Sequence, residues 1–92
     1  MPQWRKRRRF GMHPRVVKFC PYGFCPQKEA IVLSIEEFET LRLVDYLGLT
    51  QEEAGVRMGV SRGTVWRALN SARKKVATAI VEGREIVIST EH

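Results

Sequence analysis

The apolar residues of the chain predict a first helix that begins at a capping residue. Ser34 is followed three positions later by Glu37, the pattern of a capping box, and the helix is expected to run to Leu47 and stop at Gly48. Its apolar residues are spread around the whole helical wheel rather than along one stripe. The pattern therefore predicts a helix that is covered on several sides.

Two further helices are expected in close succession. A second capping box, Thr50 to Glu53, opens a short helix that ends at Gly59, and Ser61 is the expected N-cap of a third helix over 62–80. The third helix carries an apolar stripe about 120° wide. This stripe consists of Val65, Ala68, Leu69, Ala72, Val76, Ala79 and Ile80.

Three short apolar runs, residues 16–19, 30–33 and 85–88, predict β-strands, and the last is expected to pair with one of the first two. Residues 1–15 show no periodicity, so we expect a flexible basic arm there, followed by one domain over 16–92. The expected fold class is mainly α, a three-helix helix-turn-helix core with short flanking β-strands and a basic N-terminal arm.

Charge changes this picture because it is concentrated in blocks. Residues 1–28 hold eight Lys and Arg and no acid, and residues 54–75 hold six and no acid. Residues 29–53 hold seven acids and one Arg, and residues 76–92 carry a net charge of −2, so the chain carries +6. Such clustering is typical of a protein that binds a polyanion, with an unevenly charged solvated surface as the alternative. Neither a transmembrane run nor the apolar stretch of a secretory signal occurs, which favours a cytoplasmic protein without a membrane partner.

The second and third predicted helices match a helix-turn-helix unit. Gly59 permits the turn, small Gly55 permits close approach of the helices, and no carboxylate occurs between 54 and 80. A small core is expected between the two helices, formed by Ala54, Met58, Val60, Val65 and Ala68. A plain helical hairpin would pack in the same way, but the acid-free solvent face favours DNA binding.

Five motifs carry a family resemblance that covers most of the chain. They are VLSIEEFE at 32–39, LRL at 41–43, GLTQEEA at 48–54, MGVSRGT at 58–64 and ARKKVA at 72–77. The chain resembles domain-of-unknown-function family 134, whose members are predicted to bind DNA. The second half is also similar to region 4 of sigma-70 factors, whose helix-turn-helix reads promoter DNA. The resemblance implies a sequence-specific regulator of transcription. The chain departs from the family pattern at Gly55, where the family is expected to have alanine.

Helix-turn-helix geometry assigns roles to the exposed side chains. The first turns of the third helix reach base edges, where Arg67 is the best candidate for guanine O6 and N7. Trp66 is expected on a thymine methyl or a sugar, or alternatively against the N-terminal segment or another protomer. The predicted base-reading residues are Arg62, Thr64, Trp66, Arg67 and Asn70. The predicted phosphate contacts are Thr50, Gln51, Arg73, Lys74 and Lys75.

The basic arm is a further candidate for DNA contact. It is expected either to enter an adjacent minor groove or to act as a solubilising tail with non-specific attraction. Its charged residues are Arg5, Lys6, Arg7, Arg8 and Arg9.

The cysteines form a poor metal site. A structural zinc usually has four ligands, and only His13 and His92 could complete a set with Cys20 and Cys25. We therefore expect cysteines that bracket a turn, no metal and no cofactor. No nucleotide-binding glycine loop, nucleophile motif or His-carboxylate pair supports an enzyme. A module that contacts RNA polymerase or another protein through the first helix is the second functional class, and RNA binding is a third.

A homodimer is also expected, because one helix-turn-helix buries only about 600–1,000 Å² on DNA. The predicted interface combines the first helix with Val81, Ile86, Val87 and Ile88. The competing interpretation is that the strands fold back over the same chain and cover this surface internally.

Overall fold

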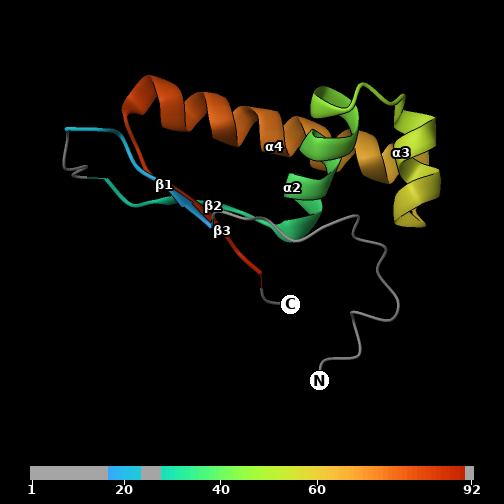
Figure 1. The fold of residues 1–92 in the computed structure, drawn as a ribbon, viewed down its shortest axis with the longest axis horizontal. Helices are drawn as coiled ribbons and strands as arrows, with labels where there is room; N and C mark the ends of the chain where they lie inside the picture. The colour runs from blue at the N-terminus through green and yellow to red at the C-terminus, as the bar shows by residue number, and fades with distance from the viewer. Residues whose placement is uncertain (1–16, 24–27, 91–92) are drawn as a thin grey trace.

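The computed structural model describes residues 17–23 and 28–90. A long helix spans the molecule, with a small sheet near its C-terminal half and two shorter helical elements near its N-terminal half (Figure 1). The elements are β1 (Lys18–Phe19), β2 (Ile31–Leu33), α2 (Ile35–Thr40), the π-helix η1 (Leu41–Tyr46), α3 (Gln51–Met58), α4 (Arg62–Glu82) and β3 (Ile86–Ile88). The predicted fold class, mainly helical with short flanking strands, is confirmed.

The helices begin at the predicted N-caps, and α3 ends at the predicted Gly59, whereas α4 continues past its predicted end at Ile80 to Glu82. The Ser34 hydroxyl accepts from the amide of Glu37 at 3.1 Å, and the Glu37 carboxylate accepts from the amide of Ser34 at 2.8 Å. Thr50 and Glu53 form the same reciprocal pair at the start of α3. Gly59 ends α3 in the left-handed conformation with φ of 73°, which glycine adopts without steric cost.

The first predicted helix changes its winding part-way along. From Leu41 onward it is a π-helix, and the amide of Leu47 donates to the carbonyl of Arg42, five residues earlier, at 2.9 Å. The predicted extent of the helical segment is confirmed, but its wider winding is not visible in the sequence pattern. The segment buries Leu43 completely, while Tyr46 is 81% exposed.

The last strand is the centre of the sheet. The strand order is β1-β3-β2, with β3 antiparallel to β1 and parallel to β2, so β3 pairs with both earlier strands. Leu33 and Ile88 pack with Ala72 of α4 in one core cluster, against Phe38 and other half-buried side chains. The strands thus fold back over the same chain, and the expected dimer surface on Ile86, Ile88 and the first helix is largely used inside the protomer.

A second cluster lies between α3, η1 and α4. It contains Leu43, Ala54, Met58 and Val65. Two residues expected to point inward are instead exposed, Val60 by 38% and Ile80 by 73%. Val60 lies in the turn after α3, while Ile80 lies toward the end of α4 that α2 and α3 do not reach (Figure 1).

Candidate nucleic-acid interface

The turn between α3 and α4 is tight because Gly55 has no side chain. The amide of Val60 donates to the carbonyl of Gly55 at 2.9 Å. A Cβ placed on Gly55 would lie 2.8 Å from the carbonyl oxygen of Val60, a distance that a backbone atom cannot relieve without moving the turn. The alanine expected here from the family pattern therefore does not fit this turn. Glycine at this position sets the approach of the two helices.

The start of α4 presents its side chains to solvent. Ser61 caps the helix by accepting from the amide of Thr64 at 3.2 Å, and the hydroxyls of the two residues lie 3.0 Å apart. Arg67 donates to the Thr64 hydroxyl at 3.4 Å, a weak contact that leaves its guanidinium accessible. The amide of Asn70 donates to the carbonyl of Trp66 at 2.8 Å, which holds that side chain along the helix.

The two helix starts meet at a shallow hollow. Thr50, Gln51 and Glu52 from the start of α3 line it together with Arg62 and Trp66 from the start of α4, around a volume of about 390 Å³. The structure therefore brings two predicted phosphate contacts beside two predicted base-reading residues. Glu52 was not predicted here. Its exposed carboxylate can accept from a base amino group but repels phosphate.

Two of the predicted phosphate contacts have partners within the protein. Arg73 forms a two-pronged pair with Asp45, with nitrogen-oxygen distances of 2.7 and 3.0 Å, and the hydrogen bond from Arg73 lowers the pKa of Asp45 below its ordinary value. Lys75 points inward, where its ammonium donates to Glu37 and to the carbonyl of Val32, both at 2.9 Å. Lys75 is thus occupied within the fold, whereas Lys74 is exposed.

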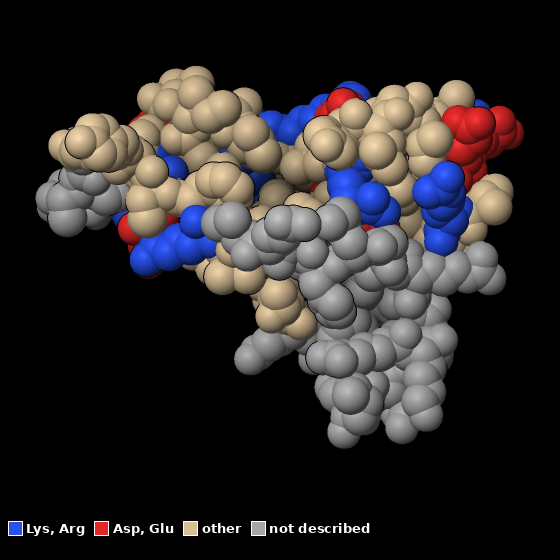
Figure 2. All heavy atoms as spheres, in the orientation of Figure 1, with Lys and Arg blue, Asp and Glu red and all other residues tan. Residues whose placement is uncertain are grey.

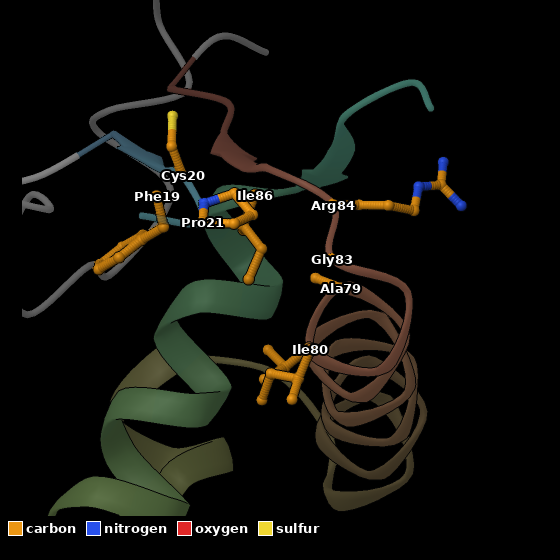
Figure 3. A pocket seen from close by; sticks show the side chains of 9 residues that line it. Phe19, Cys20, Pro21, Ala79, Ile80, Gly83, Arg84 and Ile86 are labelled. Carbon is orange, nitrogen blue, oxygen red and sulfur yellow. The ribbon is translucent and has the colours of Figure 1, made fainter. Parts of the chain in front are cut away.

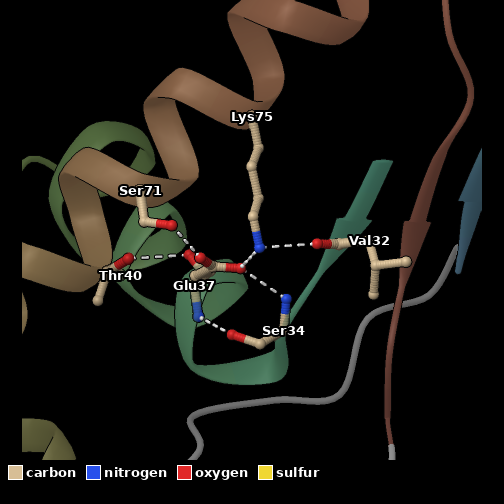
Figure 4. A network of polar contacts seen from close by, with 6 residues as sticks. All are labelled: Val32, Ser34, Glu37, Thr40, Ser71 and Lys75. Atoms are coloured by element: carbon tan, nitrogen blue, oxygen red, sulfur yellow. Dashed lines mark hydrogen bonds and ion pairs between the residues drawn. The ribbon is translucent and has the colours of Figure 1, made fainter. Parts of the chain in front are cut away.

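Lys75 belongs to a buried network that joins three elements. The carboxylate of Glu37, at the start of α2, accepts from Lys75 and Ser71 of α4 and from the amide of Ser34 (Figure 4). Burial alone would raise the pKa of Glu37, but these hydrogen bonds outweigh it and lower the pKa. The network fixes α4 against α2 and β2, and so sets the direction in which the start of α4 projects.

Charged side chains are unevenly distributed over the face in Figure 2. Lys and Arg appear near the end that carries α3, with Asp and Glu at its outer edge, and charged side chains of both signs also appear at the opposite end. The upper side of that opposite end, over the C-terminal part of α4, is mainly uncharged in this view. Five predicted site residues, Arg5, Lys6, Arg7, Arg8 and Arg9, lie outside the described residues.

Cys20 is exposed, and its thiol donates to the carboxylate of Glu85 at 3.2 Å. This hydrogen bond raises the pKa of the Cys20 thiol, which makes the thiolate a less available metal ligand. Within 17–23 and 28–90, no three His, Cys, Asp or Glu side chains gather in a metal-binding arrangement. Cys25 and His13 lie outside these ranges.

Replacing both Cys20 and Cys25 by Ser is expected to leave folding unchanged, because the exposed thiol contributes one surface hydrogen bond that a hydroxyl reproduces. Native mass spectrometry of the wild type and the double variant should give masses without zinc. Stoichiometric metal that disappears in the double variant would show that the loop is a metal site.

The comparisons with known proteins agree on one family. A model of the family described as "Protein of unknown function DUF134" matches residues 1–91. A UPF0251 protein of Pyrococcus furiosus is 59% identical, covering 96% of this chain and 88% of the relative, and one of Thermococcus kodakarensis is 64% identical, covering 88% and 74%. A UPF0251 protein of Ruminiclostridium cellulolyticum is 46% identical, covering 96% and 68%.

The chain is thus a small, mainly α-helical protein built on two helices joined by a tight turn. It belongs to the DUF134 family, as the sequence motifs predicted. No solved structure matches it. None of the helices in the described part of the chain is long and apolar enough to cross a membrane.

Proposed function

We propose that this protein binds double-stranded DNA sequence-specifically and regulates transcription in the cytoplasm, by binding rather than by catalysis. The observation that carries the proposal is the exposed start of α4, where Arg62, Trp66 and Arg67 face solvent on a stretch without acids. In a helix-turn-helix, this part of the second helix enters the major groove. The 21 residues of α4 form one uninterrupted helix, which makes a rigid support for that contact.

Arg67 and Asn70 are the proposed readers of base edges. An arginine reads guanine through O6 and N7, and an asparagine reads adenine through N6 and N7. Gly63 lies on the same exposed stretch and carries no side chain, so the helix backbone can approach the DNA closely there. Arg62, Thr64 and Trp66 complete the proposed base-reading surface.

Phosphate contacts are proposed on both sides of this surface. Thr50 and the half-buried Gln51, at the start of α3, lie beside Arg62 and Trp66, and the exposed Lys74 lies further along α4. The basic arm is proposed to add contacts in a neighbouring minor groove. Arg73 can contact a phosphate only if DNA displaces Asp45 from its guanidinium.

The proposal is tested by selecting bound fragments from random duplex DNA and measuring affinity on the selected site. Arg67→Ala is expected to cost about 1–3 kcal/mol on that site and little on random DNA, because a lost base contact removes discrimination. The matched control is Arg57→Ala, which removes the same charge beside a separate hollow lined by Leu49, Glu53 and Val56.

Salt provides the second arm of this experiment. If about six phosphates are neutralised, log K should fall with log salt at a slope near −5. Equal losses for Arg67→Ala on selected and random DNA would refute the base-reading role. Failure to enrich any sequence, with the protein folded, would refute sequence-specific binding.

A second candidate function is binding to another protein, with RNA polymerase as the proposed partner. The resemblance to region 4 of sigma-70 factors motivates this alternative. It is favoured by exposed apolar side chains at the end of η1 and on α3, where Tyr46 is 81%, Leu47 47% and Val56 72% exposed. Retention of a selected DNA sequence by the purified protein separates this function from the first, because an interaction module needs no such preference.

A further inference from the structure

An apolar groove lies at the end of the molecule opposite α3, between the sheet and the last turns of α4. Its volume is about 330 Å³. The apolar residues that line it include Phe19, Pro21, Val76, Ala79, Ile80 and Ile86. Figure 3 shows the sheet side chains and those of α4 on its two walls, with the Arg84 guanidinium directed away from it.

Within residues 17–23 and 28–90, both walls of this groove carry exposed apolar side chains. Phe19 is 54% exposed although it lies in the sheet, and Ile80 on the opposite wall is 73% exposed. Val81, next to Ile80, is 82% exposed, and Tyr22 beyond β1 is fully exposed. Single exposed apolar residues are ordinary, but a contiguous apolar surface marks an interaction site.

Charges of both signs surround the groove. Lys18 lies 3.6 Å from Glu85, and Lys28 and Arg84 lie 3.6 and 3.1 Å from Glu82. A polar rim around an apolar centre is the anatomy of a protein-protein interface. These pairs form within the protomer and are partly exposed, so a two-fold rotation can let the acids of one copy exchange partners with the bases of another.

We propose that this groove is the interface of a homodimer, with a second copy of this chain as its occupant. A two-fold interface uses the same patch twice, so the patch must carry both a hollow and a projection. The groove supplies the hollow, and the side chain of Ile80, 73% exposed on its wall, supplies the projection. The net charge of +6 opposes association of two copies, and this end of α4 keeps the acid-free start of α4 away from the contact.

The same interface fixes how two copies meet DNA, a step that rests on the proposed function. Ile80 follows Thr64 by sixteen residues (80 − 64), which is about 24 Å along a helix that rises 1.5 Å per residue. Two α4 helices that cross at a wide angle near Ile80 would therefore hold their starts one turn of DNA apart, about 34 Å. The sequence selected by the dimer is then a palindrome.

Sedimentation of the full chain without DNA tests the dimer directly. At tens of micromolar the wild type is expected at twice its mass of 10.6 kDa, and Ile80→Asp at the monomer mass, because a carboxylate in the groove must be desolvated on association. Val56→Asp is the matched control. Val56 is equally exposed, at 72%, but lies on α3, so this variant is expected to remain a dimer.

Both substituted side chains are exposed, so circular dichroism should show wild-type helix content in both variants. A monomeric wild type, or a dimer that Val56→Asp breaks and Ile80→Asp does not, would overturn the proposed interface. A monomer that gains mass only with another protein would do so as well. These measurements contain no DNA, so they test the dimer independently of the proposed function. The proposed function is refuted only if no DNA sequence is selected.

Discussion

Glu37→Ala is expected to lower the free energy of unfolding by about 2–3 kcal/mol, because it leaves the partners of a buried carboxylate without an acceptor. The residue is 7% exposed, and its oxygens accept from Lys75, Ser71 and the amide of Ser34. Most of this cost comes from the Ser71 hydroxyl and the Ser34 amide, which lose their acceptor, because the Lys75 side chain is 36% exposed and its ammonium can still reach water. In a domain of this size the loss corresponds to roughly 10–20 °C in Tm.

Glu53→Ala is the matched control for this variant. Glu53 holds the same third position of a capping box, and its carboxylate accepts from the amide of Thr50 at 2.8 Å. It is exposed, so its loss is expected to cost only about 0.5–1 kcal/mol. Urea unfolding of both variants at one protein concentration measures the difference. Equal losses would mean that capping, not the network with Lys75, is what Glu37 contributes.

The same network predicts a dependence on pH. The pKa of Glu37 is lower in the folded protein than in the unfolded chain, so its ionisation adds stability above the ordinary pKa of glutamate. That stability is lost as pH falls through the folded pKa. The gap in unfolding free energy between wild type and Glu37→Ala should therefore narrow below about pH 4. A gap that keeps its full size at pH 3 would show that the charge is not involved.

Gly55→Ala is expected to destabilise the protein by about 1–3 kcal/mol, against the usual preference of helices for alanine. In a helix interior, alanine is usually more stabilising than glycine by about 0.5–1 kcal/mol. Here, however, the added Cβ would lie 2.8 Å from the carbonyl oxygen of Val60, and overpacking against backbone costs more than that gain. Relief requires a shift of the turn at Val60, two residues before α4 begins at Arg62.

Gly63→Ala provides the comparison, since Gly63 also lies within a helix. The nearest atom to its added Cβ is a terminal nitrogen of Arg67, at an ordinary contact distance of 3.7 Å. This variant is expected to be more stable than the wild type by about 0.5–1 kcal/mol. Thermal and urea unfolding should thus move the two glycine variants in opposite directions. A stabilised Gly55→Ala would show that the turn is looser than the structure indicates.

The parts of the fold that could be predicted are those that depend on local chemistry. A hydroxyl three residues before a glutamate caps a helix wherever it occurs, and Ser34 and Thr50 do so here. The end of α3 follows from Gly59 in the same way, since the left-handed conformation suits glycine. Local hydrogen bonds need only neighbours in sequence, which is why these boundaries were found.

The parts that could not be predicted depend on partners far apart in sequence. The inward direction of Lys75 depends on Glu37, 38 residues away, and the pairing of Arg73 depends on Asp45, 28 residues away. One signal was available for Lys75, because it lies beside Ala72 and Val76 of the apolar stripe. Ile80 is exposed because the other helices do not reach its end of α4. The periodicity of apolar residues indicates which face of a helix is apolar, but not how much of its length is covered.

The position of β3 in the sheet has a consequence for the order of folding. β3 separates β1 from β2, and its partners Phe19 and Ile31 are made long before Ile86. During synthesis both outer strands must wait, unpaired, until the chain has passed the whole of α4. The contacts among α2, α3 and α4 span shorter loops and close sooner, because loop closure costs more entropy for longer loops. The end of the molecule that carries α3 can therefore form before the end that carries the apolar groove, because one wall of the groove is completed only by β3.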